Sequence, residues 1–294
     1  MKGVLFAVIA TIIWSGNFIV ARAVIKDVPP ISLAFFRWLL ATIILLPFAF
    51  RQLRTEWDVV GNNWKYFLFI AFTGITLFNT FVYVAGHYSP AINLALIGTT
   101  SSPIMAIMLS AIFLQEKIPW QRVAGLLLCI TGILLLLSRG DLRNLYQLQF
   151  GKGDGYVLLG AFAFAIYNVL VRKKPAGIGP LSFLLLIFGL GTILLIPGLV
   201  WEINHEPPIH WSASIIGVMV YLGAGTSVIA YLCWNAAISR LGTSRTALFG
   251  NLIPLFASLE ALWLLQEKFT MLHLVCSVVI IIGLVLANLT TRRT

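Results

Sequence analysis

Long apolar segments alternate with short polar stretches along the whole chain. Each apolar segment holds roughly 20 residues, which is enough for an α-helix to cross the ~30 Å of hydrocarbon in a bilayer. We therefore predict an all-α integral membrane protein with ten membrane-spanning helices. The predicted spans are residues 3–24, 31–50, 65–86, 91–114, 120–138, 154–173, 180–200, 211–235, 243–266 and 270–289.

One apolar segment and its polar end occur twice. Pro103 precedes Leu114-Gln-Glu-Lys117, and Pro254, 151 positions later, precedes Leu265-Gln-Glu-Lys268. This duplication predicts two repeats, residues 1–139 and 154–294, with a linker at 140–153 that is rich in glycine and charge. Each repeat holds an odd number of spans, so the two must insert in opposite orientations. Inverted repeats are typical of alternating-access transporters.

The composition agrees with a membrane location. The chain is 60% hydrophobic and 10% charged, whereas soluble proteins carry about 25% charged residues. The net charge of +10 does not indicate a nucleic-acid partner, because the basic residues lie between apolar segments and form no stacking motif. Cys129, Cys233 and Cys276 lie inside apolar segments without paired spacing, so we expect no disulfide, no metal and no cofactor.

The distribution of lysine and arginine predicts that both termini are cytoplasmic, because cytoplasmic loops carry an excess of these residues. The loops on the side of the N-terminus hold 13 of them: Lys2, Arg51, Arg54, Lys65, Lys117, Arg122, Arg172, Lys173, Lys174, Arg240, Arg245, Arg292 and Arg293. The opposite loops hold 6: Arg22, Lys26, Arg139, Arg143, Lys152 and Lys268.

Three motifs together resemble a known family. They are Trp14-Ser-Gly-Asn-Phe18 in the first span, Phe36-Arg37-Trp38 in the second, and the proline helix that ends in Leu-x-Glu. This combination resembles the EamA-type branch of the drug/metabolite transporter superfamily. The resemblance implies ten helices, cytoplasmic termini, and transport of a metabolite through a central cavity. Gln115 and Gln266 depart from it, since the family usually has glycine before the glutamate.

Polar and aromatic side chains recur on one face of several predicted spans, at matching positions of the two repeats. Within hydrocarbon such side chains mark either a helix-packing seam or a wet pathway. We interpret the set as the wall of a substrate cavity, because its aromatic members are too large for close seams. The candidate binding residues are Trp14, Asn17, Thr76, Asn79, Thr80, Tyr83, Asn93, Thr100, Tyr167, Asn168, Ser227, Tyr231, Trp234, Ser244 and Asn251.

A second set of residues is predicted to be structural or to take part in gating. Prolines in the proline helices remove a backbone hydrogen bond, which would either let those helices bend as access alternates or give them a fixed kink that shapes the cavity. The terminal glutamates would fix the helix ends. These candidates are Arg37, Pro103, Glu116, Pro254 and Glu267. Glu260 is a candidate for proton coupling, although helical spacing places it away from the predicted cavity face.

Transport is favoured over other function classes. The aspartates lie in loops or at span ends and the histidines form no cluster, so we do not expect an enzyme. A channel is less favoured because the chain lacks a filter-like segment. No nucleotide-binding loop occurs, which favours secondary transport, with or without protons as a coupling ion.

The predicted partners are a small-molecule substrate and the lipid bilayer, in a bacterial inner membrane, with the chain as a monomer or a homodimer. No charged residue is assigned to the cavity wall, which favours neutral, zwitterionic or amphipathic solutes over phosphorylated sugars. The resemblance implies export of amino acids or other metabolites, and the aromatic wall favours aromatic or large apolar amino acids. Efflux of hydrophobic, cationic drug-like compounds, or of a different metabolite, is the alternative.

Overall fold

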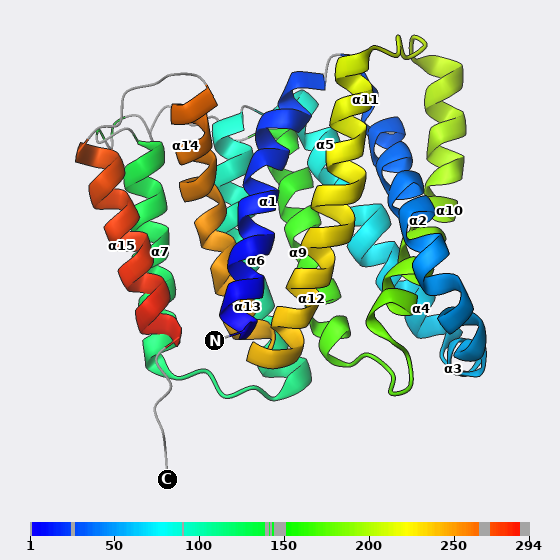
Figure 1. Cartoon of the computed structure of the whole chain (residues 1–294). Coiled ribbons are helices and arrows are strands. Elements are labelled where there is room, and N and C mark those ends of the chain that lie inside the picture. The colour runs from blue at the N-terminus through cyan, green and yellow to red at the C-terminus, as the bar shows by residue number, and fades with distance from the viewer. Residues whose placement is uncertain are drawn as a thin grey trace.

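The computed structural model describes residues 2–24, 27–89, 91–138, 141, 143, 151–264 and 271–288. All elements in these residues are helices, which confirms the predicted all-α class for this part of the chain. Most of them run along a common direction in one bundle (Figure 1). The first half contains α1 (Lys2–Val24), α2 (Pro30–Thr55), α3 (Trp57–Asn62), α4 (Trp64–Ala71), η1 (Phe72–Leu77), α5 (Phe78–Tyr88), α6 (Ala91–Leu114) and α7 (Trp120–Leu137). The second half contains α9 (Lys152–Arg172), α10 (Pro180–His205), α11 (Ala213–Val220), η2 (Tyr221–Ile229), α12 (Ala230–Leu241), α13 (Thr243–Leu248), η3 (Phe249–Leu252), α14 (Ile253–Leu264) and α15 (Met271–Asn288).

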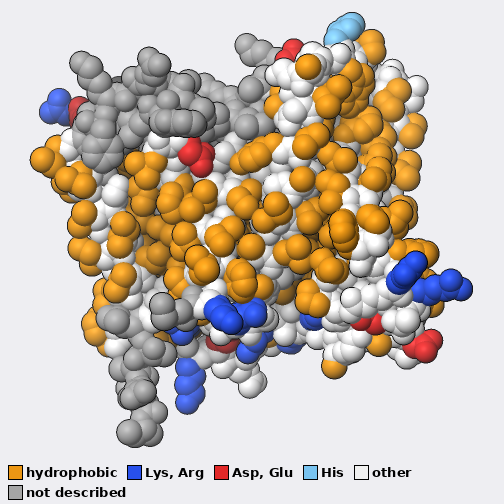
Figure 2. Space-filling view, in the orientation of Figure 1, with side chains coloured by type: hydrophobic (Ala, Val, Ile, Leu, Met, Phe, Trp, Pro, Cys, Tyr) orange, Lys and Arg blue, Asp and Glu red, His pale blue; other side chains and the backbone are white. Residues whose placement is uncertain are grey.

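Five helical segments are long and apolar enough to cross a membrane. They are Pro30–Thr55, Trp64–Tyr88, Lys152–Arg172, Pro180–His205 and Ala213–Leu241. Shorter apolar helices cover Lys2–Asn17, Thr100–Leu114, Trp120–Leu136 and Leu274–Asn288. Figure 2 shows a broad hydrophobic band on the pictured face, with most of the lysine and arginine side chains below it. The side chains of Phe48 and Trp120 are 71% and 70% exposed, a surface that suits lipid better than water.

The two proline-containing spans differ from each other. α6 runs through Pro103 as one uninterrupted helix. The predicted span 243–266 is instead divided into α13, the 3-10 helix η3 and α14, so the expectation of one continuous helix is wrong there. Pro254 is the second residue of α14. Proline is tolerated in the first turn of a helix, where its missing N–H needs no partner, and the change of helix type just before it follows from that preference.

Two π-helical segments occupy matching places in the two halves. η1 lies between α4 and α5, and η2 lies between α11 and α12. Ser227 in η2 donates its hydroxyl to the carbonyl oxygen of Leu222 at 2.8 Å, which satisfies a backbone acceptor within the widened turn. π-helical turns are rare and often occur at functional sites. The apolar pattern did not predict them, because the spacing of apolar residues hardly distinguishes the two helix types.

The helices α7 and α15 pack closely along a seam lined by glycine. A Cβ atom added to Gly125 would lie 2.3 Å from the carbonyl oxygen of Gly283, so a larger residue would force the helices apart. Cys129 donates from Sγ to the carbonyl oxygen of Ile280 at 3.4 Å, across a separation of 151 residues. Small residues let membrane helices approach and pack where the hydrophobic effect does not drive association.

The helices α2 and α10 also lie side by side, and a carboxylate from α10 caps the start of α2. Glu202 is buried, and it accepts the backbone N–H of Ile31 at 2.8 Å and that of Ser32 at 2.6 Å. It also accepts the Ser32 hydroxyl at 2.8 Å. These contacts satisfy N–H groups that have no partner within their own helix.

A carboxylate after the end of α2 makes the reciprocal contact with α10. Glu56 accepts the backbone N–H of Gly179 at 3.1 Å, just before α10 begins. Partial burial raises the pKa of the Glu56 carboxyl, but hydrogen bonds from Gly179 and Gln52 and the charge of Lys174 outweigh burial and lower the pKa overall. The two helices are therefore joined at both ends by the same kind of interaction.

Candidate functional site

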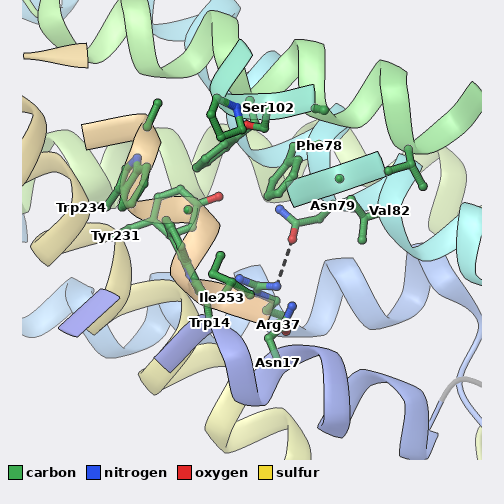
Figure 3. Close-up of a pocket in the computed structure, with 17 residues that line it drawn as sticks. Trp14, Asn17, Arg37, Phe78, Asn79, Val82, Ser102, Tyr231, Trp234 and Ile253 are labelled. Carbon is green, nitrogen blue, oxygen red and sulfur yellow. Dashed lines mark hydrogen bonds between the residues drawn. The ribbon is translucent and has the colours of Figure 1, made fainter. Parts of the chain in front are cut away.

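A cavity of about 110 Å³ lies between helices from both halves of the chain. Side chains from α1, α2, α5, α6, α9 and α12 and from the α13–α14 region converge on it (Figure 3). The described residues that line it are Trp14, Asn17, Arg37, Phe78, Asn79, Val82, Gly98, Ser102, Pro103, Val157, Ala161, Phe164, Tyr231, Trp234, Ala247, Gly250 and Ile253.

Aromatic rings packed around Trp14 form one side of the cavity. The ring centroids of Tyr231, Trp234 and Phe164 lie 5.6, 4.9 and 5.7 Å from that of Trp14. Tyr231 and Phe164 meet it edge to face, a favoured geometry for aromatic pairs. Trp14 Nε1 donates to the carbonyl oxygen of Thr226 at 2.9 Å, which fixes the indole in place. The cavity thus has a rigid apolar wall.

Arg37 brings a positive charge into the cavity wall. Its side chain is buried, and Nε donates to Ser227 Oγ at 2.7 Å. Nη1 donates to Asn79 Oδ1 at 3.0 Å and to the Tyr83 hydroxyl at 2.8 Å, and Nη2 reaches the carbonyl oxygen of Thr226 at 3.4 Å. Figure 3 shows the contact with Asn79 as a dashed line. The expectation of a cavity wall without charge is wrong, because neutral oxygens from both halves accommodate the guanidinium.

Two asparagines add polar groups to the wall. Asn79 is buried, accepts from Arg37, and makes a long contact from Nδ2 to the carbonyl oxygen of Ile75 at 3.5 Å. Asn17 Oδ1 is buried and accepts no hydrogen bond from any described residue. An unpaired buried acceptor costs about 1–3 kcal/mol. A polar group of a bound solute would satisfy it.

The structure brings some of the predicted binding residues into this wall and places others between helices. Trp14, Asn17, Asn79, Tyr231 and Trp234 line the cavity, together with Arg37 and Pro103 from the second set. The predicted binding residues that are described but are not among the lining residues are Thr76, Thr80, Tyr83, Thr100, Tyr167, Asn168, Ser227, Ser244 and Asn251. The side chain of Asn93 and the whole of Glu267 lie outside the described residues.

The residues outside the wall mostly hold helices together. Thr76 donates to the carbonyl oxygen of Gly191 at 3.3 Å. The Tyr167 hydroxyl donates to Asn235 Oδ1 at 2.8 Å. Trp234 Nε1 donates to Asn168 Oδ1 at 2.7 Å, so Asn168 supports a wall residue from behind. The polar stripes therefore contain both residues that line the cavity and residues that join helices.

Several lining residues were missed because they are apolar or small. They are Phe78, Val82, Gly98, Ser102, Val157, Ala161, Phe164, Ala247, Gly250 and Ile253. Phe164 was within reach of sequence reasoning, since it precedes Tyr167 by one helical turn. Its ring stacks on Phe78 with a centroid distance of 4.5 Å. Ser102 carries a hydroxyl but is one of four consecutive hydroxyl residues, Thr99 to Ser102, and the remaining missed residues carry no polar side chain.

Below the cavity, Glu116 joins the end of α6 to the start of α13. Its carboxylate accepts the backbone N–H of Thr243 at 3.1 Å, the N–H of Ser244 at 3.3 Å and the Ser244 hydroxyl at 2.5 Å. Ser244 also shares a hydrogen bond with Ser110 of α6. Gly242, with φ of +85°, turns the chain into this contact. We call this region the Glu116 end of the bundle; it links one half of the chain to the other beneath the cavity.

Gln115 follows the last residue of α6 and lies in the left-handed backbone region, with φ of 52°. A residue with a Cβ atom is strained there, whereas glycine is not. We expect Gln115→Gly to stabilise the protein by about 0.5–1 kcal/mol and to raise the melting temperature measured in detergent. Gln115→Ala removes the same exposed side-chain amide but keeps Cβ. An equal rise in both variants would show that backbone strain is not the cause.

Glu260 packs against α1 and is not among the described lining residues. Its Oε1 accepts the Ser15 hydroxyl at 2.6 Å. This geometry agrees with the prediction that Glu260 faces away from the cavity. Its part in proton coupling stays a prediction, as does bending at Pro103 and Pro254.

Comparison with known proteins adds an independent line of evidence. The sequence profile of the family described as "EamA-like transporter family" matches residues 1–138 and residues 151–289. An uncharacterized transporter of Archaeoglobus fulgidus is 29% identical over 264 residues, which cover 90% of this chain and 89% of that protein. A "probable amino-acid metabolite efflux pump" of Escherichia coli is 25% identical over 290 residues, 96% of this chain and 93% of that protein. One solved crystal structure covers 97% of this chain and 96% of its own, with a TM-score of 0.78 at 18% identity, and so shares the fold.

Proposed function

The chain belongs to the EamA-like transporter family, and from this premise we propose that it exports small metabolites. The name of its Escherichia coli relative, "probable amino-acid metabolite efflux pump", supports amino acids as the exported class. Family membership makes the chain a multi-pass membrane transporter and not an enzyme. The proposed substrates are aromatic or large apolar amino acids, carried from the cytoplasm across a bacterial inner membrane. One observation carries the proposal: a cavity with aromatic and amide walls lies between the two halves.

The proposed architecture is ten spans in two inverted repeats, residues 1–139 and 154–294, which exchange access to the cavity. The double match of the family profile supports this arrangement. The reciprocal contacts of Glu56 and Glu202 between α2 and α10 support it as well. Figure 1 places the start of α1 and the end of α15 at the same end of the bundle. This end also carries Arg240 and Arg245, which supports a cytoplasmic location for both termini.

Aromatic amino acids fit the cavity better than the alternative class. The rings around Trp14 would pack against an apolar side chain, and Asn17 Oδ1 offers an acceptor to an ammonium group. A cationic drug-like compound would meet the like charge of Arg37 in the same wall. Coupling to protons and the choice between monomer and homodimer are independent of this proposal.

Filling the cavity tests the proposal directly. A Cβ atom added to Gly250 meets no atom within 4 Å, although Gly250 lines the cavity. We expect Gly250→Leu to fold but to lower the rate of phenylalanine counterflow in proteoliposomes about tenfold or more, because leucine would occupy the substrate volume. Gly217→Leu is the matched control, since Gly217 is exposed and equally free of neighbours.

Wild-type flux should saturate with phenylalanine concentration and show counterflow, as a carrier does. Linear flux without counterflow would indicate a channel. Equal counterflow in the Gly250→Leu variant and in the wild-type protein would contradict transport through this cavity. The outcome for Gly217→Leu shows whether adding a leucine is itself harmful.

A further inference from the structure

Arg37 is a buried cation whose described hydrogen-bond acceptors carry no negative charge. The guanidinium group keeps its charge in proteins, and burying a charge without a counter-charge is costly. Within the described part of the chain, all four of its hydrogen-bond acceptors are neutral oxygens. The described carboxylates Glu202, Glu116 and Glu260 accept hydrogen bonds from Ser32, Ser244 and Ser15, and none of them accepts one from Arg37.

The guanidinium group also keeps unused donor capacity. It has five N–H groups, and the described residues supply four contacts, of which the Nη2 contact with Thr226 is long at 3.4 Å. Nε and Nη1 are held by Ser227, Asn79 and Tyr83, so the group has a fixed orientation in the wall. The Nη2 group therefore keeps an N–H that no described residue accepts, and a carboxylate oxygen of a solute would accept it in a charge-assisted hydrogen bond.

We infer that Arg37 binds the carboxylate of the transported solute. The inference rests on the proposed function and narrows it: the substrates are monocarboxylates with an apolar body, α-amino acids among them. In an amino acid, the ammonium group would meet Asn17 Oδ1, and the side chain would lie along the rings of Trp14 and Tyr231. Cations without a carboxylate are excluded by repulsion. Doubly charged phosphate esters are excluded because one guanidinium does not balance them.

A series of phenylalanine analogues tests this inference. Binding of L-phenylalanine, 3-phenylpropionate, L-phenylalaninamide and phenethylamine to the purified full chain in detergent would be measured by calorimetry or by the shift in melting temperature. The two carboxylates should bind about tenfold or more tightly than the amide and the amine, because a charge-assisted hydrogen bond is lost without the carboxylate. Equal or tighter binding of the amide, or no binding of either carboxylate, would overturn the inference.

Variants then assign the preference to one side chain. Arg37→Gln should bind phenylalanine and phenylalaninamide within about threefold of each other, and Arg37→Lys should keep part of the preference as a point charge. Arg51→Gln, in the same helix but exposed, should leave the preference unchanged. If Arg37→Gln does not fold, the relative affinities of the four ligands for the wild-type chain still test whether a carboxylate is required for binding.

These experiments distinguish a failure of carboxylate recognition by Arg37 from a failure of the proposed transport function. Carboxylate-selective binding without saturable counterflow of labelled phenylalanine would refute the proposed transport function and keep the role of Arg37. Saturable counterflow that proceeds equally well with phenylalaninamide would refute the role of Arg37 and keep the transport function.

Discussion

Replacing Glu116 with alanine is expected to open the cavity toward the Glu116 end and to reduce net transport to near background. The variant loses all three hydrogen bonds that hold the start of α13 to the end of α6. Hydrogen bonds to a charged group contribute about 1.5–3 kcal/mol each. Every 1.4 kcal/mol lost changes the population of a closed state by about tenfold. A transporter that does not close on one side cannot alternate.

Thiol labelling measures this opening. In a chain without native cysteines, Ala247→Cys would place a thiol on the cavity wall, where Ala247 is buried next to α6. An impermeant maleimide added at the Glu116 end should label it about tenfold or more faster once Glu116 is replaced. Glu206→Ala is the control, because Glu206 is an exposed carboxylate after α10. Unchanged labelling and unchanged transport in a folded Glu116→Ala variant would show that this contact does not close the cavity.

The second large effect is expected from Glu202, which caps α2 from inside the bundle. Glu202→Ala leaves two backbone N–H groups and the Ser32 hydroxyl without their acceptor, in a place where water does not replace it. Unsatisfied buried groups cost about 1–3 kcal/mol each. We therefore expect a fall in unfolding free energy of at least ~3 kcal/mol, or a chain that does not accumulate in the membrane.

Glu56 provides a matched comparison, because it caps α10 in the same way from a half-exposed position. Glu56→Ala should cost less than about 1 kcal/mol, since water can take the place of the carboxylate. The measurement is the midpoint of thermal or denaturant unfolding in detergent for both variants. Similar losses for the two variants would mean that burial does not determine the value of these caps.

Sequence reasoning identified the helical class and the aromatic core of the cavity for clear physical reasons. The apolar segments had the length of a membrane span, and each of those that the structure describes is helical. Tyr231 and Trp234 were predicted because large rings do not fit close helix seams, and both line the cavity. Tyr83 was predicted for the same reason, but it bonds to Arg37 and is not among the described lining residues. The break before Pro254 was missed, since a proline alone does not reveal whether a helix kinks or starts anew.

The positions of the other predicted site residues depend on contacts with residues that are distant in the sequence. Thr76 and Tyr167 lie on polar stripes like the wall residues do, but they bond to Gly191 and Asn235 of neighbouring helices. Polar residues repeated at helical spacing show that one face of a helix is polar, but they do not show whether that face lines a cavity or packs against another helix. Arg37 was assigned a structural or gating role, because its acceptors come from η2 and α5 and are not visible near it in the sequence.

The seam between α7 and α15 bears on how such a chain arose. In the proposed repeats, Cys129 of the first half corresponds to Ile280 of the second, and the structure places these two positions in contact. If the two repeats are related as proposed, a contact between corresponding positions would lie close to the axis that relates them. In an ancestral dimer of identical five-helix chains, the same residue would have met its own copy there, and any substitution would have appeared on both sides at once. In a single chain the two positions are free to differ, and here the thiol of Cys129 meets the backbone carbonyl of Ile280 while the Ile280 side chain lies against Gly132.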